Sequence, residues 1–142
     1  MPSASPLPLS SGIPATDKGG PQKIAVALFP ETGVACGHDG NFASCPLTPE
    51  LTRRLQARPL QYVDQLCRCP GPYHSPSFTV SPTTDGAVVK VGLTLDRGQQ
   101  SLDLAVTHPT GVWLASDVTC TGFGTSTSLF SDAPTNCFAI PG

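Results

Sequence analysis

The sequence predicts an α+β domain in which short N-terminal helices cover a curved antiparallel β-meander. Apolar residues in the first half follow a helical spacing, whereas those from Phe78 to Val118 recur at every second position. The helical segments precede the strands instead of alternating with them, as is typical of α+β proteins. The 16 prolines and 14 glycines among 142 residues favour turns and short strands over long helices.

Composition narrows the classes of function. The net charge is −2 and charged residues make up 13% of the chain, so no basic surface is available to attract nucleic acid. The longest apolar run is Ile24–Phe29, far shorter than the roughly 20 residues that cross a bilayer. We therefore expect no nucleic-acid partner and no membrane span in this chain. A length of 142 residues fits one domain.

The cysteine content indicates an oxidising compartment. An even number of cysteines in a chain poor in lysine and rich in serine and threonine is typical of disulfide-bearing exported proteins. We therefore expect an extracytoplasmic location, secreted or anchored upstream of residue 1. The six cysteines are Cys36, Cys45, Cys67, Cys69, Cys120 and Cys137.

We favour one pairing, Cys120 with Cys137. These two residues bracket a segment rich in glycine, serine and threonine that contributes little packing of its own. A disulfide that closes such a loop would stabilise the domain by about 3 kcal/mol in the chain-entropy description. The other four stay in unassigned pairing, with a second bridge expected from Cys36 or Cys45 to the Cys67/Cys69 pair.

A zinc site is the alternative for these cysteines. Cys36, Cys45, Cys67 and Cys69 could bind zinc together with His38 and His74, since thiolate and imidazole are its preferred ligands. The spacing matches no common zinc motif. We therefore expect disulfides, no bound metal and no cofactor.

Residues 1–21 contain five prolines and read as a disordered Pro/Ser-rich linker, either a native tether or an expression remnant. The single folded domain is then expected to span residues 22–142. Its first segment, Gln22–Phe29, fits two helical turns or a buried strand, because a short apolar run does not reveal its period.

A helix start is predicted at Thr48, which would cap the helix with Pro49 in its first position. Leu51 and Leu55 lie on one helical face, and Pro59 ends the helix. Leu60–Leu66 could form a second short helix with Tyr62 facing inward.

Four strands follow, separated by turn sequences rich in glycine, proline and aspartate. Their alternation predicts one buried face on each strand and an antiparallel meander overall. The residues expected to face the core are Phe78 and Val80; Val89, Val91, Leu93 and Leu95; Leu102, Leu104 and Val106; and Val112, Leu114 and Val118.

The order of these motifs resembles small exported bacterial proteins of the nuclear-transport-factor-2-like, cystatin-like superfamily. The resemblance covers about residues 45–122 and is carried by Leu47–Leu51, by the cysteine-containing segment Asp64–Cys69 and by the strand Gly111–Cys120. It implies a curved sheet wrapped around helices as a cone. The long first helix of that fold is matched here by Gln22–Phe29 alone. The superfamily contains enzymes, ligand carriers and interaction domains, so the resemblance implies a pocket without a particular chemistry.

Two candidate sites come from these considerations. His38 and Asp39 are the weak catalytic candidates, because a histidine beside a carboxylate can move protons at neutral pH. Trp113, the single tryptophan, and Tyr62 are candidates for the wall of an apolar ligand pocket.

We expect a noncatalytic extracytoplasmic binding or interaction domain with an apolar pocket between its sheet and helices, and a small apolar ligand or a protein as its partner. One alternative is a small cone-fold isomerase, dehydratase or hydrolase that uses His38 and Asp39. The other is a structural accessory domain tethered by the N-terminal arm.

Overall fold

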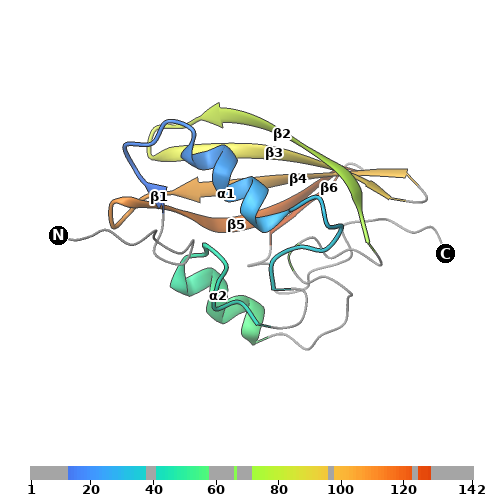
Figure 1. The fold of residues 1–142 in the computed structure, drawn as a ribbon, viewed down its shortest axis with the longest axis horizontal. Helices are drawn as coiled ribbons and strands as arrows, with labels where there is room; N and C mark the ends of the chain where they lie inside the picture. The colour runs from blue at the N-terminus through green and yellow to red at the C-terminus, as the bar shows by residue number, and fades with distance from the viewer. Residues whose placement is uncertain are drawn as a thin grey trace.

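The computed structural model describes residues 13–37, 41–57, 66, 72–95, 98–122 and 125–128. A curled antiparallel sheet lies against two helices, so the α+β class is confirmed (Figure 1). In chain order the elements are β1 (Ile13–Pro14), α1 (Gly20–Leu28), α2 (Pro49–Gln56), β2 (His74–Pro82), β3 (Gly86–Leu95), β4 (Gly98–Thr107), β5 (Val112–Gly122) and β6 (Thr125–Ser128).

The strands β2 to β5 form the predicted meander, and the sheet order is β1-β5-β4-β3-β2 with β6 also on β5. Among the described residues, three segments share the outer edge of β5. They are β1, residues 46–48 and β6, and the middle one bonds through Ala115 N–H to Pro46 O and Thr48 N–H to Ala115 O. At the opposite edge of the sheet, no segment in the described part of the chain pairs with the outer side of β2.

The predicted inward faces are confirmed in β3 and β4 and are wrong in the first half of β5. Trp113 and Ala115 are buried there, whereas the predicted Val112 and Leu114 are half-buried on the other face. Val118, further along, is buried as expected. The buried residues of β3 and β4 that match the prediction are Val89, Val91, Leu93, Leu102, Leu104 and Val106.

A β-bulge at Ser116 explains the change of face. The register pairs Ala105 with Asp117 but Val106 with Ala115, so Ser116 is an extra residue on β5. Its hydroxyl donates to Ala105 O at 3.3 Å. Because one extra residue inverts which side chains face the core, simple alternation fails across this point.

Helix α1 resolves the ambiguity of the first apolar run in favour of a helix. It begins at Gly20, with Pro21 in the first turn where a missing N–H costs no hydrogen bond. The last helical bond runs from Phe29 N–H to Ala25 O at 2.8 Å. Pro30 follows and has no N–H with which to continue the helix.

Helix α2 matches its prediction in detail. Thr48 Oγ1 accepts a hydrogen bond from Leu51 N–H at 3.3 Å, and Pro49 occupies the first helical position. Leu51 and Leu55 are fully buried on one face. The helix ends at Gln56, ahead of Pro59 as expected.

The fold includes residues that the composition assigns to a linker. Ile13 is buried and pairs with Trp113 in β5. The turn that follows is closed by Asp17 N–H to Pro14 O and by Gly20 N–H to Asp17 O, both at 2.9 Å. The boundary expected after residue 21 is therefore wrong for residues 13–21, and the rest of the expected linker lies outside the described residues.

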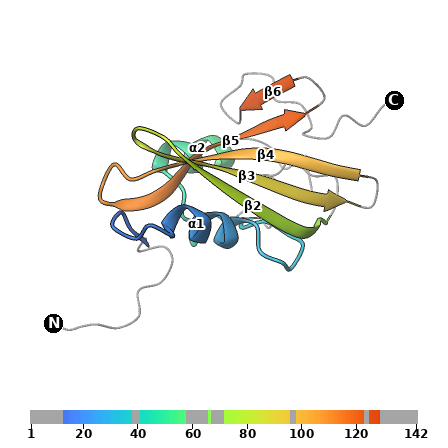
Figure 2. The same cartoon turned by 90° about the horizontal axis from the view of Figure 1, so that it is seen from above.

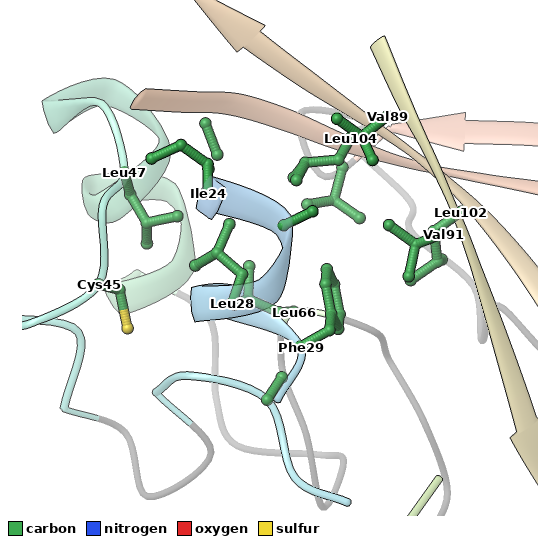
Figure 3. Packing of buried hydrophobic residues seen from close by; sticks show 14 of the residues in the cluster. Ile24, Leu28, Phe29, Cys45, Leu47, Leu66, Val89, Val91, Leu102 and Leu104 are labelled. Atoms are coloured by element: carbon green, nitrogen blue, oxygen red, sulfur yellow. The ribbon is translucent and has the colours of Figure 1, made fainter. Parts of the chain in front are cut away.

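The core lies between the sheet and α1, with α2 packed beside β5 (Figures 1 and 2). Figure 3 shows α1 between the strands and residues 45–47, with Ile24, Leu28 and Phe29 in the contact. Leu66 is buried in the same cluster, whereas the rest of the second short helix expected over residues 60–66 lies outside the described residues.

Candidate functional site

A disulfide joins Cys36 to Cys45 and closes a loop on the α1 side of the domain. The expectation of a bridge from Cys36 or Cys45 to the Cys67/Cys69 pair is therefore wrong. Cys36 N–H donates a hydrogen bond to Leu28 O at 2.8 Å. This bond holds the start of the loop against the last residue of α1. Proximity along the chain, nine residues, makes this bridge easy to form.

The same disulfide removes two of the proposed zinc ligands, because zinc binds thiolates and these sulfurs are bonded to each other. Within the described ranges, no cluster of histidine, cysteine, aspartate or glutamate is suited to hold a metal ion.

Several predicted site residues lie outside the described part of the chain. They are His38, Asp39 and Tyr62, together with Cys67, Cys69, Cys137 and the side chain of Cys120. The His38–Asp39 pair therefore stays a hypothesis, and so does the Cys120–Cys137 bridge.

Trp113 fastens the N-terminal segment to the sheet. Its indole Nε1 donates to the main-chain oxygen of Asp17 at 3.0 Å. A Cβ built on Gly20 would lie 2.1 Å from Trp113 Cδ1, so the helix backbone rests directly on the indole ring. His108 packs edge-to-face on Trp113 with ring centroids 4.7 Å apart. These contacts assign Trp113 a packing role.

The side chain of Asp17 completes this N-terminal contact. Its Oδ2 accepts from Lys23 Nζ at 2.6 Å, and its Oδ1 accepts from Gly19 N–H at 2.9 Å. The Lys23 ammonium, followed by the Gly19 amide, lowers the pKa of Asp17 below its usual value. Both side chains reach solvent, so the pair orders the turn before α1 without forming a buried reactive centre.

Tyr73 is the buried tyrosine that sequence reasoning missed. Its hydroxyl donates to Pro30 O at 2.8 Å, its N–H donates to Gly33 O at 3.0 Å, and its ring meets Phe29 edge-to-face. It fixes the segment after α1 against the start of β2. No local pattern could have shown this, because Tyr73 stands in a proline-rich stretch and its partners are some 40 residues away.

A cross-strand ion pair lies on the convex face of the sheet. Lys90 Nζ lies 3.8 Å from Asp103 Oδ1, and both side chains are partly exposed. No hydrogen bond reaches Asp103 Oδ1 from the residues that the structure describes. A pair of this length and exposure contributes little stability.

The hairpin contacts determine which backbone groups of β2 point away from the sheet. Thr83 N–H donates to Gly86 O at 2.9 Å, and the pairing then continues without a shift as far as Ser77. Along two antiparallel strands, residues that exchange backbone hydrogen bonds with the partner strand alternate with residues whose N–H and C=O groups point away from it. The odd-numbered residues from 77 to 81 therefore bond to β3, and the N–H and C=O groups of Phe78 and Val80 point to the open edge.

Prolines bound this open edge. Pro82 ends β2, and Pro76 lies in a bulge, where it and Ser75 together face Leu93. Ser75 has a φ of 49°, which marks the bend in the strand. Because proline has no N–H, the open edge between these bounds offers two backbone donors, those of Phe78 and Val80. Sequence reasoning missed this edge, since it located the strand but not its place in the sheet.

Neither helix in the described part of the chain has the length and apolar character that a membrane crossing requires. No family model matches the sequence, and comparisons with curated proteins and with solved structures give no significant match.

Proposed function

We propose that this chain is a noncatalytic extracytoplasmic interaction domain that binds through its outer surface and its open strand edge. The observation that carries the proposal is the packing of the concave side. There, helix α1 fills the curl of the sheet with Ile24, Ala25 and Leu28, each with no exposed surface. Side chains thus occupy the place where a cone-shaped fold would hold a ligand.

The chemistry of the packed interior supports the same conclusion. In the part of the chain that the structure describes, the buried residues are apolar apart from Thr48 and Gln100. Thr48 uses its hydroxyl to cap α2, and Gln100 Nε2 donates to the neighbouring Ser101 O at 3.1 Å. Neither side chain titrates near neutral pH, so neither suits general acid–base catalysis.

The Cys36–Cys45 disulfide supports the extracytoplasmic part of the proposal. Disulfides persist where the surroundings are oxidising and are rare in reducing cytosol. The resemblance to exported nuclear-transport-factor-2-like proteins agrees with this location and with an interaction role, one of several known in that superfamily.

A probe of apolar cavities tests the proposal. We expect 1-anilinonaphthalene-8-sulfonate to show no saturable binding to the folded chain at neutral pH. Leu28→Ala with benzene is the matched positive control, because removing a fully buried leucine leaves an apolar cavity of the size that takes benzene, which the wild-type chain should not bind. Saturable binding of one probe per wild-type chain would contradict the filled interior and favour a ligand carrier.

A further inference from the structure

Residues 76–82 read Pro-Ser-Phe-Thr-Val-Ser-Pro, which is symmetric about Thr79 apart from the exchange of Phe78 for Val80. The same residues form the open edge of β2. Any strand can pair antiparallel with a copy of itself about a two-fold axis, and in this strand an axis at Thr79 places like residues opposite each other, serine against serine and proline against proline.

We propose that two copies of this chain pair through their β2 edges, antiparallel, with a two-fold axis at Thr79. The pairing deepens the surface-binding function proposed above, on which it rests, by naming a second copy as the partner. Phe78 of each copy then lies opposite Val80 of the other. Both open-edge N–H groups of each copy donate to the carbonyl oxygens that face them.

The prolines fit this register. Pro76 of one copy meets Pro82 of the other, so the two residues that have no N–H face each other and no backbone donor is left without a partner at either end of the pairing. Moving the two-fold axis to Phe78 would place the bulge around Ser75 opposite the end of the partner's strand, and moving it to Val80 would place Pro76 opposite the partner's hairpin turn. The regular stretch of β2 therefore has one register centred on Thr79.

Side chains on the inner face of the extended sheet suit the pairing. Val80 is 37% exposed, one of the two large apolar residues at this level of exposure in the described chain. Phe78 packs against the core on the same face. An aromatic residue opposite a β-branched one is a favourable cross-strand pair, and Val80 would lose exposed surface against Phe78 of the second copy.

Electrostatics also favour a second copy. A two-fold axis brings the residues beside it near their own counterparts, so a charged residue close to Thr79 would repel its copy. No residue from 75 to 82 carries a charge. The nearest lysine, Lys90, pairs with Thr79 from β3. Three strand spacings, about 14 Å, would separate Lys90 from its counterpart, beyond the screening length of about 8 Å at physiological salt.

The interface is small, because it consists of one strand edge. Contacts below the usual size of stable interfaces are weak, so we expect a concentration-dependent dimer with a dissociation constant of roughly 0.1–1 mM. Sedimentation velocity across this range should show the sedimentation coefficient rising with concentration.

Charge substitutions at the two-fold position test the geometry. Thr79 is exposed, and Thr79→Lys or Thr79→Glu would place like charges directly opposite each other. Each variant alone should dimerise at least about tenfold more weakly than the wild type, and an equimolar mixture of the two should recover association. Thr84→Lys and Thr84→Glu, the same changes at an exposed hairpin position, are the matched controls and should leave dimerisation unchanged. Thermal unfolding of every variant checks folding.

A cysteine at the axis provides a second readout that does not depend on affinity. Residues 79 of the two copies form a non-hydrogen-bonded pair, with Cα atoms about 4.5 Å apart, which a disulfide can bridge. Thr79→Cys should give a covalent dimer on non-reducing gels under mild oxidation, and Thr84→Cys should not.

A wild-type chain that stays monomeric up to about 1 mM would overturn the pairing, and so would dimers that both Thr79 charge variants leave intact. Binding of a synthetic peptide of residues 76–82 by a chain that never dimerises would also overturn it, in favour of an edge that recruits other extended segments. These experiments test the pairing of β2 edges, whereas the cavity probe tests the filled interior, so either proposal can be contradicted without the other.

Discussion

The indole Nε1 of Trp113 donates a hydrogen bond to the main-chain oxygen of Asp17, 96 residues earlier in the sequence. Next to this bond, Ile13 pairs with Trp113, and Ala15 N–H donates to Gly111 O. The N-terminal segment thus closes part of the outer edge of β5, and backbone pairing and the Trp113 side chain together attach it. An edge covered in this way cannot pair with other chains.

Replacing Trp113 by phenylalanine should loosen the segment before α1. The substitution removes the donor and leaves the partly buried oxygen of Asp17 without its partner, which we expect to cost about 1–3 kcal/mol of unfolding free energy. Urea unfolding measures the loss, and amide hydrogen exchange at Ala15 should accelerate. Leu114→Val, on the other face of β5, is the control. Unchanged protection at Ala15 would contradict the attachment.

Two adjacent glycines provide a matched test of the contact between α1 and Trp113. A Cβ on Gly20 would lie 2.1 Å from Trp113 Cδ1, closer than any real contact, whereas the nearest atom to a Cβ on Gly19 is 3.4 Å away. Gly20→Ala should therefore destabilise the fold by about 1–3 kcal/mol through forced displacement of the ring, and Gly19→Ala should change it by less than about 0.5 kcal/mol. Equal effects in thermal unfolding would show that the helix does not rest on the indole.

The Asp17–Lys23 pair should make stability depend on acid pH. Because Lys23 lowers the folded-state pKa of Asp17, the stabilisation is fully present above the unfolded value of about 3.9 and is lost as pH falls through the folded value. Asp17→Asn should remove this part of the pH dependence. An NMR titration of the carboxyl group should show its pKa rising in Lys23→Gln. Asp85→Asn, the same change at an exposed loop position, is the control, and an unmoved Asp17 titration would refute the coupling.

Because Cys36 and Cys45 share one disulfide, the losses of stability caused by substituting each of them should not add. Cys36→Ala, Cys45→Ala and the double variant should each lose about 2.5 kcal/mol, because any of them opens the same short loop. A double variant that loses the sum of the two single effects would show that the two cysteines do not bond to each other. Thiol titration of the wild type in denaturant without reductant should find neither residue free.

The features that the sequence predicts correctly, the start of α2 and the meander of strands, depend on residues close together in the chain. Thr48 and Pro49 define the start of α2 because capping depends on residues within one turn. The meander follows from alternation and short turns, which are also local. The hydroxyl bond of Tyr73 reaches Pro30, 43 residues earlier, so no local signal predicts it. The Cys36–Cys45 bridge spans only nine residues, but six cysteines allow 15 full pairings and their spacing does not choose among them.

Two predictions are wrong for the same kind of reason: the assignment of Ile13 to a linker, and the unbroken alternation of side chains across Ser116. Ile13 reads as linker because glycine and proline surround it, yet the free edge of β5 gives it a pairing partner. Ser116 reads as an ordinary strand residue, although the register with β4 leaves it unpaired. In both cases a long-range backbone contact overrides the composition of the segment.

The bulge at Ser116 can be tested because alternation and the structure predict opposite results. Ala115 has no exposed surface, whereas Leu114 is half-buried on the other face. Ala115→Lys should therefore cost more than about 3 kcal/mol or prevent folding, since it buries a charge without a partner. Leu114→Lys should cost less than about 1.5 kcal/mol, because its ammonium can reach water. Urea unfolding of the two variants, equal in charge and adjacent in sequence, measures the difference. The reverse order would mean that β5 continues without a bulge and that Trp113 faces away from the core.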